Sequence, residues 1–321
     1  MSESVSLRDI QEARSRLDGI IHKTPVLGSR SLGEMVGAPL YFKCENLQRT
    51  GAFKIRGSYN KLAQLTPIQR SSGVVTASSG NSGCGTAYAG KLLGIRTVIV
   101  MSEHPAPAKK AACEAYGAEL LFVGQTTSER LAKASELAQE QNLVIAHPYD
   151  DPQVIAGQGT IGLEMLEQLP DVEQIVIQIG GGGLLAGIAV ALRESGYRGL
   201  IIGVEPEVSP RMAYAFQQGA PEVVPQWSVS IADGINSNRA GEHTYPLVRR
   251  HVDRLVTVSE AEIIEATKLL IERSKLFVEP SGAATFAAAL AGKIEPRLKT
   301  ICLISGGNTD LRTLHSVLYG N

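Results

Sequence analysis

Short apolar runs alternate with helical patterns through the central part of the chain. The apolar runs are rich in β-branched side chains, which is typical of buried strands, and the segments between them have the apolar spacing of helices. A strand followed by a helix, repeated several times, predicts a parallel sheet with right-handed crossovers. The predicted strands lie at 74–78, 97–101, 119–123 and 143–147, and the predicted helices at 82–93, 106–116 and 128–141.

The same alternation resumes near residue 157 and predicts a second sheet. We therefore expect an α/β fold with two parallel-sheet domains and a cleft between them. No polar linker separates the two regions, so we expect residues 73–150 to form a small inserted α/β domain. Residues 1–72 and 151–321 would together form the large one. The elements predicted outside the insert are helices at 6–17 and 157–169 and from about 184, 261 and 282, and strands at 40–44, 174–179, 200–205, 254–258 and 300–305.

The charge balance argues against a polyanionic partner. Lysine and arginine number 31, and aspartate and glutamate 32, so the net charge is −1 and no basic field exists to hold nucleic acid or an anionic membrane. Aromatic residues make up only 5% of the chain, which argues against a stacking platform for single strands. No apolar run reaches the about 18 residues of a membrane span. We therefore expect a small-molecule partner.

Cysteine usage indicates a reducing compartment. The four cysteines are widely scattered and contain no CxxC pair, so neither a zinc site nor a disulfide framework is predicted. The N-terminal segment is charged and amphipathic, and it lacks the apolar core of a signal peptide. A cytoplasmic setting is therefore the simplest expectation. The cysteines are Cys44, Cys84, Cys113 and Cys302.

Lys54 is the first candidate for chemistry. It stands between Phe53 and Ile55, just after a glycine turn in the stretch NLQRTGAFKIRG. Burial disfavours the ammonium form of a lysine, and a neutral amine can attack an aldehyde to form a Schiff base. Surface lysines often have apolar neighbours too, so on this pattern alone a surface position is the simpler interpretation.

Four consecutive glycines, Gly180–Gly183, follow a predicted strand and open a predicted helix. Glycines let backbone N–H groups approach an anion closely, and a helix N-terminus favours negative charge. The stretch matches neither the dinucleotide fingerprint nor the P-loop, so it predicts a phosphate cup of another kind, with a plain flexible turn as the alternative.

Two further polar loops follow predicted strands, TASSGNSG at 76–83 and LISGGNTD at 303–310. Serine and asparagine at a helix start can hold a carboxylate, although ordinary helix capping explains them equally well. Ser305 would face the crevice at the carboxyl edge of its sheet, where ligands bind in open α/β folds. Because all four signals lie at strand ends, a single crevice would bring them together.

The combination of these motifs resembles the threonine dehydratase/serine racemase family. KCENLQRTGAFKIRG, ASSGNSG, HPYDDPQVIAGQGTIGLE, GGGGLLAG, VEP, ADGI, VEPSGAA and SGGN occur in the order seen in that family, over about residues 5–318. Its members are fold-type II enzymes, also called the tryptophan-synthase-β-like group, which use pyridoxal 5′-phosphate. The resemblance implies the same fold and cofactor, and it is less specific for the substrate.

The resemblance also implies a role for each motif. Lys54 would be the Schiff-base lysine and proton shuttle, and Ser79 a second acid/base on the opposite face. Ser78, Ser79, Gly80 and Asn81 would bind the substrate carboxylate. The cofactor would contact Phe53, Lys54, Asn81 at its 3′-oxygen, Gly180, Gly181, Gly182, Gly183 and Leu184 at its phosphate, Glu279 near its ring, and Ser305 at its pyridine nitrogen. A helix-terminal carboxylate before Pro280 explains Glu279 as well.

This chain departs from the family pattern at two places. Ser82 stands where members often have histidine after the asparagine of the first loop. Metal-dependent members place a carboxylate six residues after the glutamate of the xEP motif, whereas here Arg211 follows Glu205 at that spacing. Arginine cannot ligate Mg²⁺ or Ca²⁺, so we predict no metal ligands, and the guanidinium could replace the charge of the cation.

The reaction that the resemblance implies is β-elimination of L-threonine or L-serine to a 2-oxo acid and ammonia. The alternatives on the same scaffold are serine racemization and dehydration of 3-hydroxyaspartate or another hydroxy amino acid. An alternative of a different class is a phosphate-binding module that uses the glycines alone, and the intact Lys54 argues against it. The resemblance further implies a homodimer or homotetramer, and the short chain after SGGN indicates no C-terminal regulatory domain.

Overall fold

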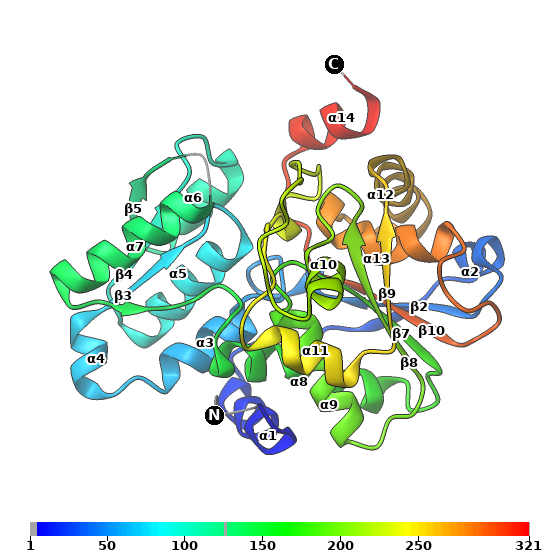
Figure 1. Cartoon of the computed structure of the whole chain (residues 1–321), viewed down its shortest axis with the longest axis horizontal. Coiled ribbons are helices and arrows are strands. Elements are labelled where there is room, and N and C mark those ends of the chain that lie inside the picture. Colours follow the sequence, from blue (N-terminus) through cyan, green and yellow to red (C-terminus); the bar gives the residue numbers. More distant parts are fainter. Residues whose placement is uncertain (1–4, 125–126, 321) are drawn as a thin grey trace.

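The computed structural model describes residues 5–124 and 127–320 and contains two sheets (Figure 1). One sheet has six strands in the order β1-β2-β10-β7-β8-β9, and the other has four in the order β5-β4-β3-β6. We call the parts of the chain around them the large and the small domain. The expected α/β fold with two parallel-sheet domains is thereby confirmed.

The six-stranded sheet of the large domain is parallel except at one edge, where β1 pairs with β2 in the antiparallel direction. The parallel pairing was predicted from the strand and helix alternation, but the antiparallel edge strand was not. The six strands of this sheet are β1 (Val26–Gly28), β2 (Leu40–Cys44), β7 (Gln174–Gln178), β8 (Leu200–Pro206), β9 (Arg254–Val258) and β10 (Thr300–Ile304).

The four-stranded sheet of the small domain is entirely parallel. Its two central strands are buried on both faces, which explains their continuous apolar runs. The strands are β3 (Val74–Ala77), β4 (Thr97–Met101), β5 (Glu119–Phe122) and β6 (Val144–Ile145), and the helices between them are α5 (Asn81–Leu93), α6 (Pro107–Ala115) and α7 (Thr127–Gln141).

Helices cover both faces of the large sheet, and each face has its own apolar core. α1 (Leu7–Leu17), α8 (Pro152–Gln168), α9 (Gly183–Glu194) and α11 (Thr244–His251) pack together on one side. The other side carries α2 (Arg30–Val36), α12 (Glu260–Ser274) and α13 (Pro280–Leu290) (Figure 1). The remaining helical elements are α3 (Ile55–Ala63), α4 (Pro67–Ser72), α10 (Arg211–Gln218), α14 (Leu311–Tyr319) and the 3-10 turns η1 (Glu45–Leu47) and η2 (Asp233–Ile235).

The predicted elements agree with the structure where the apolar pattern is strong. The strands expected at 97–101 and 254–258 have those bounds, and the first helix ends at Leu17 as expected, with Ser6 as its cap. α8 begins at Pro152 rather than at residue 157, because Asp151 caps it and Pro152 starts its first turn, which the apolar pattern does not predict. The apolar pattern did not predict β1, α2, α4, α10, α11 or α14.

The proposed domain boundaries stay a prediction. α3 and α4 precede the expected boundary at residue 73, yet Ile55, Leu62 and Leu65 belong to an apolar cluster that includes Val74 of the small sheet. The predicted segments also include residues 1–4, 125–126 and 321, which lie outside the described part of the chain. Within the described part, no helix has the length and apolar character needed to cross a membrane.

Candidate active site

Lys54 lies between the carboxyl end of β2 and the first residue of α3. Its side chain is part-buried, and Nζ donates a hydrogen bond to the carbonyl of Pro148 at 2.9 Å. Burial lowers the pKa of Lys54 to about 8, since the charged form loses hydration. Lys54 is therefore less exposed than the surface position that its flanking pattern alone favoured, and a minor fraction of its amine is neutral near physiological pH.

A buried cluster of charges fixes the backbone below Lys54. Arg56 donates two hydrogen bonds to Glu45, at 2.7 and 2.9 Å, and others to Glu164, at 2.6 and 3.0 Å. Lys43 supplies a second positive charge, and its Nζ donates a hydrogen bond to Glu164 Oε2 at 2.5 Å. We call Lys43, Glu45, Arg56 and Glu164 the inner cluster. It joins β2, η1, α3 and α8, so it holds the first turn of α3 against the large domain.

The glycine loop Gly180–Gly183 connects β7 to α9 at the carboxyl edge of the large sheet. A Cβ atom on Gly181 would stand 2.2 Å from the ring of Tyr149, and one on Gly183 would stand 2.6 Å from its carbonyl oxygen. Gly182 has a φ of 103°. Side chains are therefore excluded at Gly181 and Gly183 by close packing and at Gly182 by backbone conformation.

The amides at the start of α9 are available to an anion. Gly182 caps this helix without a side-chain hydrogen bond, and the first turn of a helix has N–H groups without intrahelical partners. Thr244 Oγ1 and the Gly241 amide both donate to the carbonyl of Gly181, at 2.7 and 3.1 Å, which fixes the peptide orientation. The loop can hold a phosphate through backbone groups alone.

Tyr149 joins the glycine loop to Lys54. Its ring covers Gly181, and the residue before it, Pro148, supplies the carbonyl that accepts from Lys54 Nζ. Pro148 and Tyr149 follow β6 of the small domain, so three strand ends from two sheets meet here. Neither residue was predicted as a site component, although both lie in the quoted motif HPYDD.

Ser305 follows β10 directly and is 4% exposed. Its carbonyl accepts a hydrogen bond from the Phe53 amide at 3.1 Å, and Ala52 forms a bridge with Gly306. The segment that carries Lys54 and the segment that carries Ser305 therefore run side by side. The sequence expectation that these strand ends share one crevice is supported for this pair.

Asn81, Glu279 and Asn308 meet beside Gly306. Asn81 Nδ2 donates to Glu279 Oε1 at 2.5 Å, and Asn308 Nδ2 donates to Asn81 Oδ1 at 2.9 Å. A Cβ atom on Gly306 would stand 2.5 Å from Glu279 Oε1, so a larger residue there would displace the Glu279 carboxylate. Asn81 begins α5 of the small domain, whereas Glu279 caps α13 of the large domain. These contacts therefore cross between the domains.

The loop Ser78–Gly80 lies between β3 and α5 and is partly exposed. The Gly80 amide donates to Ser78 Oγ at 3.2 Å, and the Ser102 amide donates to Ser79 Oγ at 2.6 Å. Ser79 Oγ is thus an acceptor, which leaves its own hydroxyl proton free to be donated. The loop and the N-terminus of α5 form a polar rim that can receive a carboxylate.

Lys109 is a residue for which the sequence carries no signal. It lies on α6 with only 3% exposure, and Nζ contacts Asp233 at 2.7 Å and Glu279 at 3.4 Å. Burial opposes its charge, but the two carboxylates raise its pKa above the ordinary value. We call Asn81, Lys109, Asp233 and Glu279 the cleft cluster. It connects the small domain to η2 and α13 of the large domain.

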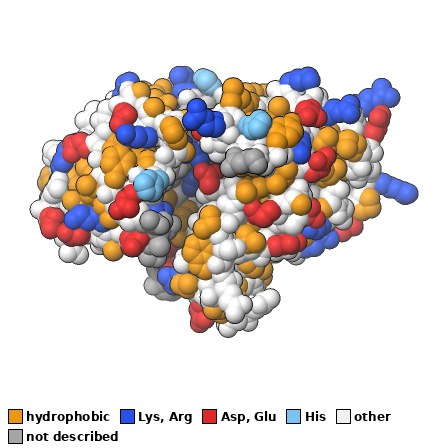
Figure 2. Space-filling view, turned by 90° about the horizontal axis from the view of Figure 1, so that it is seen from above, with side chains coloured by type: hydrophobic (Ala, Val, Ile, Leu, Met, Phe, Trp, Pro, Cys, Tyr) orange, Lys and Arg blue, Asp and Glu red, His pale blue; other side chains and the backbone are white. Residues whose placement is uncertain are grey.

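The predicted site residues therefore gather at the carboxyl edges of the two sheets. Figure 2 shows that this molecule is hollowed between its two parts, with acidic and basic side chains in the hollow. Phe53, Lys54, Asn81, Glu279 and Ser305 are linked by the contacts above, and Lys54 is linked to the glycine loop through Pro148 and Tyr149.

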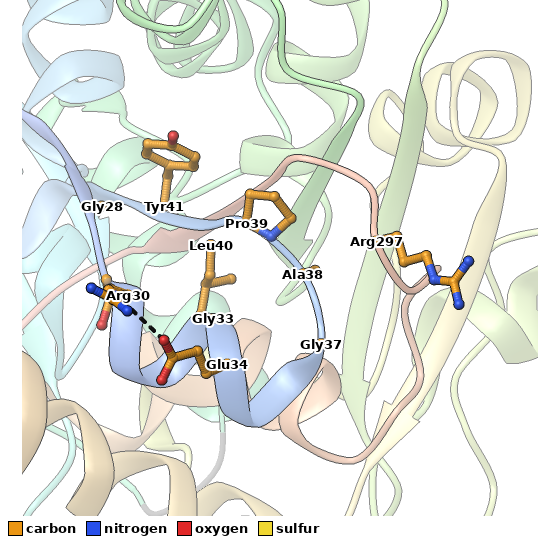
Figure 3. A pocket seen from close by; sticks show the side chains of 11 residues that line it. Gly28, Arg30, Gly33, Glu34, Gly37, Ala38, Pro39, Leu40, Tyr41 and Arg297 are labelled. Carbon is orange, nitrogen blue, oxygen red and sulfur yellow. Dashed lines mark hydrogen bonds and ion pairs between the residues drawn. The ribbon is translucent and has the colours of Figure 1, made fainter.

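A cavity of about 680 Å³ lies at the opposite edge of the large sheet (Figure 3). It opens between α2 and the start of β2, with Tyr41 and Arg297 on its walls. Arg30, which also lines it, pairs with Glu34 at 3.0 Å. The cavity lies at the amino ends of β2 and β10, away from every predicted site residue. We therefore do not propose it as the active site.

Comparison with protein families gives a match over most of the chain. A family model described as "Pyridoxal-phosphate dependent enzyme" matches residues 17–306. The L-threonine ammonia-lyase of Geobacter sulfurreducens is 45% identical over 310 residues, which are 96% of this chain and 77% of that protein. The catabolic L-threonine dehydratase TdcB of Escherichia coli is 42% identical over 317 residues, which are 98% of this chain and 96% of that protein.

Solved structures give the same fold. Maize serine racemase superposes with a TM-score of 0.93 at 36% identity, covering 99% of this chain and 98% of that one. The processed form of threonine deaminase isoform 2 from Solanum lycopersicum superposes with a TM-score of 0.91 at 32% identity, covering 99% of this chain and 91% of that one. Both likenesses span the two sheets and the cleft between them.

Proposed function

Because the chain belongs to the family of pyridoxal-phosphate dependent enzymes, we propose that it converts L-threonine or L-serine to a 2-oxo acid and ammonia by β-elimination. Relatives that are 40–45% identical over nearly the whole chain carry the names L-threonine ammonia-lyase and L-threonine dehydratase. The observation that carries the proposal is part-buried Lys54, whose pKa of about 8 provides an amine that can hold an aldehyde and accept a proton.

The residues present fit pyridoxal phosphate. The glycine loop and the Leu184 amide at the start of α9 would hold its phosphate, and Lys54 Nζ would hold its aldehyde carbon covalently. When bound, the cofactor draws electron density from the substrate α-carbon and makes the α-proton removable. The other contacts that we propose are Asn81 with the ring oxygen, Ser305 with the ring nitrogen, and Phe53 and Glu279 beside the ring.

Lys54 is the proposed general base. With the cofactor and substrate bound, Lys54 Nζ would accept the proton from the substrate α-carbon. Its low pKa keeps a useful fraction unprotonated, and the Pro148 carbonyl accepts one of its hydrogen atoms at 2.9 Å and so orients it. The β-hydroxyl would leave as water by gaining a proton, which balances the proton that Lys54 takes from the α-carbon. Addition of one water molecule to the resulting enamine would then release the 2-oxo acid and ammonia.

The loop Ser78–Asn81 is proposed to bind the substrate carboxylate. It lies at the N-terminus of α5, where backbone N–H groups and the helix dipole favour an anion. Binding at this loop would draw the small domain toward the large one, since the Asn81 side chain already reaches Glu279. The domain contact and substrate binding would therefore support each other.

Ser79 is the residue on which we expect the balance between elimination and racemization to depend. A racemase needs a second acid/base on the face opposite Lys54, and we propose Ser79 for that position. Its Oγ accepts from the Ser102 amide at 2.6 Å, which directs it toward the end of β4. We therefore propose elimination as the main reaction. The likeness to maize serine racemase supports racemization as the alternative, and formation of D-serine would favour it.

The proposal is tested by a substrate screen on the protein supplied with pyridoxal phosphate. L-Threonine, L-serine, D-serine and 3-hydroxyaspartate are incubated separately, and 2-oxo acid, ammonia and chirality are measured. We expect 2-oxo acid and ammonia in equal amounts from L-threonine or L-serine. Conversion of L-serine to D-serine without ammonia would instead identify a racemase, and turnover of 3-hydroxyaspartate alone would identify a different dehydratase.

Lys54→Ala is the control for the covalent role. Borohydride reduction should fix the cofactor to the peptide that contains Lys54 in the wild type, and mass spectrometry of the digest should locate it there. The variant should lose both this label and turnover. Labelling of another lysine, or normal turnover by the variant, would refute the assignment. Sedimentation of the same sample tests the further proposal that the chain forms a homodimer or homotetramer.

A further inference from the structure

Arg211 is a fully buried arginine whose head group is surrounded by backbone carbonyls. Nε donates to the carbonyl of Ser209 at 2.8 Å, and Nη2 also donates to that oxygen. Nη1 donates to the carbonyl of Ile179 at 3.1 Å and to that of Ile235. A buried guanidinium needs such acceptors because its charge has lost contact with water.

Glu205 balances this charge without occupying the donors of Arg211. Its carboxylate lies 3.6 Å from Arg211 Nε and accepts hydrogen bonds from the amides of Met212 and Ala213, at 2.8 and 2.9 Å. The carboxylate is therefore held by the first turn of α10, and the guanidinium N–H groups remain directed at the carbonyls of Ser209, Ile179 and Ile235. Both side chains are fully buried, so salt in the solvent screens the pair little.

The three carbonyls belong to loops at the carboxyl edge of the large sheet. Ile179 directly precedes the glycine loop, Ser209 follows β8, and Ile235 ends η2. Gly180 packs on Ile235, since a Cβ atom on this glycine would stand 3.5 Å from Ile235 Cα. Arg211 thus ties the root of the glycine loop to two neighbouring loops.

The atoms that surround the guanidinium are one carboxylate and several carbonyl oxygens. Such oxygens are the ligands that Ca²⁺ and Mg²⁺ prefer, and a cation of that kind would need the same space and the same carbonyls as the arginine. A metal site at Glu205 therefore does not fit this chain. We propose that Arg211 is a built-in cation, a positioning residue that holds the glycine loop in place and makes the protein independent of divalent metal.

The sharpest test reverses the charge at this position. Arg211→Asp leaves two buried carboxylates beside the same carbonyls, so we expect a lower thermal midpoint in EDTA and a rise on addition of Ca²⁺ or Mg²⁺. The wild type should show the same midpoint in EDTA and in either metal. Measuring the cofactor-free proteins keeps this result independent of the substrate, so its failure would leave the proposed reaction untouched.

Two outcomes would overturn the proposal. One is a wild-type midpoint that falls in EDTA and recovers with Ca²⁺ or Mg²⁺, which would mean that a metal binds despite Arg211. The other is an Arg211→Asp variant that is as stable as the wild type in EDTA and unaffected by metal. If that variant does not fold, the wild-type comparison alone still decides the metal question.

A second measurement tests the link to the glycine loop, and it rests on the proposed role of that loop in holding the cofactor phosphate. Arg211→Met keeps most of the side-chain volume and removes the hydrogen bonds to Ile179 and Ile235. We expect its affinity for pyridoxal phosphate to fall roughly tenfold or more, since hydrogen bonds from charged groups are lost. Arg211→Lys, which keeps the charge, should lose less. Unchanged affinity in Arg211→Met would refute the positioning role.

Discussion

The inner cluster below Lys54 and the cleft cluster beside it both pair charged side chains, but they differ in burial and in the balance of charge. The inner cluster has two positive and two negative charges, none more than 9% exposed. The cleft cluster has one lysine for two carboxylates, and Asp233 is 55% exposed. It also joins two domains, so its contacts depend on how the domains sit against each other.

The difference in charge balance shifts the pKa values of the two buried glutamates, Glu45 and Glu279, in opposite directions. Burial alone would raise the pKa of Glu45, but attraction and hydrogen bonds from Arg56 lower it below its ordinary value. Burial also raises the pKa of Glu279, and Lys109 offsets this only in part. Among the described residues, Glu279 Oε2 has no hydrogen-bond partner. The balanced cluster fixes structure, whereas the unbalanced one is sensitive to pH and to domain position.

The largest effect on stability should come from breaking the inner cluster at Arg56. Arg56→Met leaves Glu45 and Glu164 buried without their main partner, which costs about 3–5 kcal/mol. In a protein of this size we expect the thermal midpoint to fall on the order of 10 °C. Arg8→Ala is the control, because its pair with Glu12 is exposed and contributes little. Equal midpoints for both variants would contradict the structural role of the cluster.

Breaking the cleft cluster should affect turnover more than stability. Lys109→Met removes the bridge from α6 to Asp233 and Glu279, and we expect turnover to fall about 10–100-fold, as for other supporting contacts. Because Lys109 lowers the pKa of Glu279, its removal raises that pKa further. Glu279 then protonates at higher pH, so the acid limb of the pH–turnover profile should move upward.

Lys109→Arg separates charge from packing in this test. Arginine keeps the positive charge, so the pH profile should stay close to that of the wild type even if turnover falls. A purely structural role for Lys109 would lower turnover in both variants and leave both profiles unshifted. The stability of Lys109→Met should also fall less than that of Arg56→Met, and the opposite order would contradict the contrast drawn between the clusters.

The sequence predicted Lys54 and the glycine loop better than it predicted either charge cluster. Lys54 and the glycine loop have local signals, an apolar flank and a run of glycines between strand and helix. Glu279 was identified by resemblance to a family motif. Lys109 had no signal, because a Lys-Lys pair near a helix start is ordinarily solvated, and only the structure shows its burial and its contacts with Asp233 and Glu279.

The fold shows the same limit. Buried strands such as β4 and β9 have continuous apolar runs, which a pattern reveals directly. The short edge strand β1 and the surface helices α2 and α4 are defined by their partners and caps rather than by their own apolar pattern. The inner cluster was also missed, because its charges pair across 11–121 positions along the chain.

Ser305 tests whether an added charge is tolerated near Glu279 of the cleft cluster. The site there is buried and its neighbours include the Phe53 amide and Gly306, which contacts Glu279. Ser305→Asp would hold a proton on the ring nitrogen of the cofactor, which a hydroxyl does not. We expect turnover to fall about tenfold, equivalent to about 1.4 kcal/mol in the barrier. Ser305→Thr keeps the hydroxyl and is the control, and equal turnover in both would contradict the proposed role.

The smallest predicted effect concerns the two buried lysines of the cleft, which differ in whether a carboxylate is near. Lys109 has two and a raised pKa, whereas Lys54 Nζ has the Pro148 carbonyl and the Phe53 ring beside it and a pKa of about 8, below its ordinary 10.5. Between about pH 8 and pH 10.5 the unfolded chain binds a proton at Lys54 that the folded chain does not. The free energy of unfolding of the cofactor-free wild type should therefore rise with pH over this interval, relative to Lys54→Met.

Below about pH 8 both states of the wild type bind that proton, so the two proteins should change with pH in parallel and the variant should be the more stable. Denaturant midpoints at pH 7, 8.5 and 9.5 measure the gap, which we expect to narrow as the pH rises. A constant gap would mean that the amine is solvated in the folded state. That result would remove the reason for assigning the proton transfer to Lys54, while leaving the balance of the inner cluster unaffected.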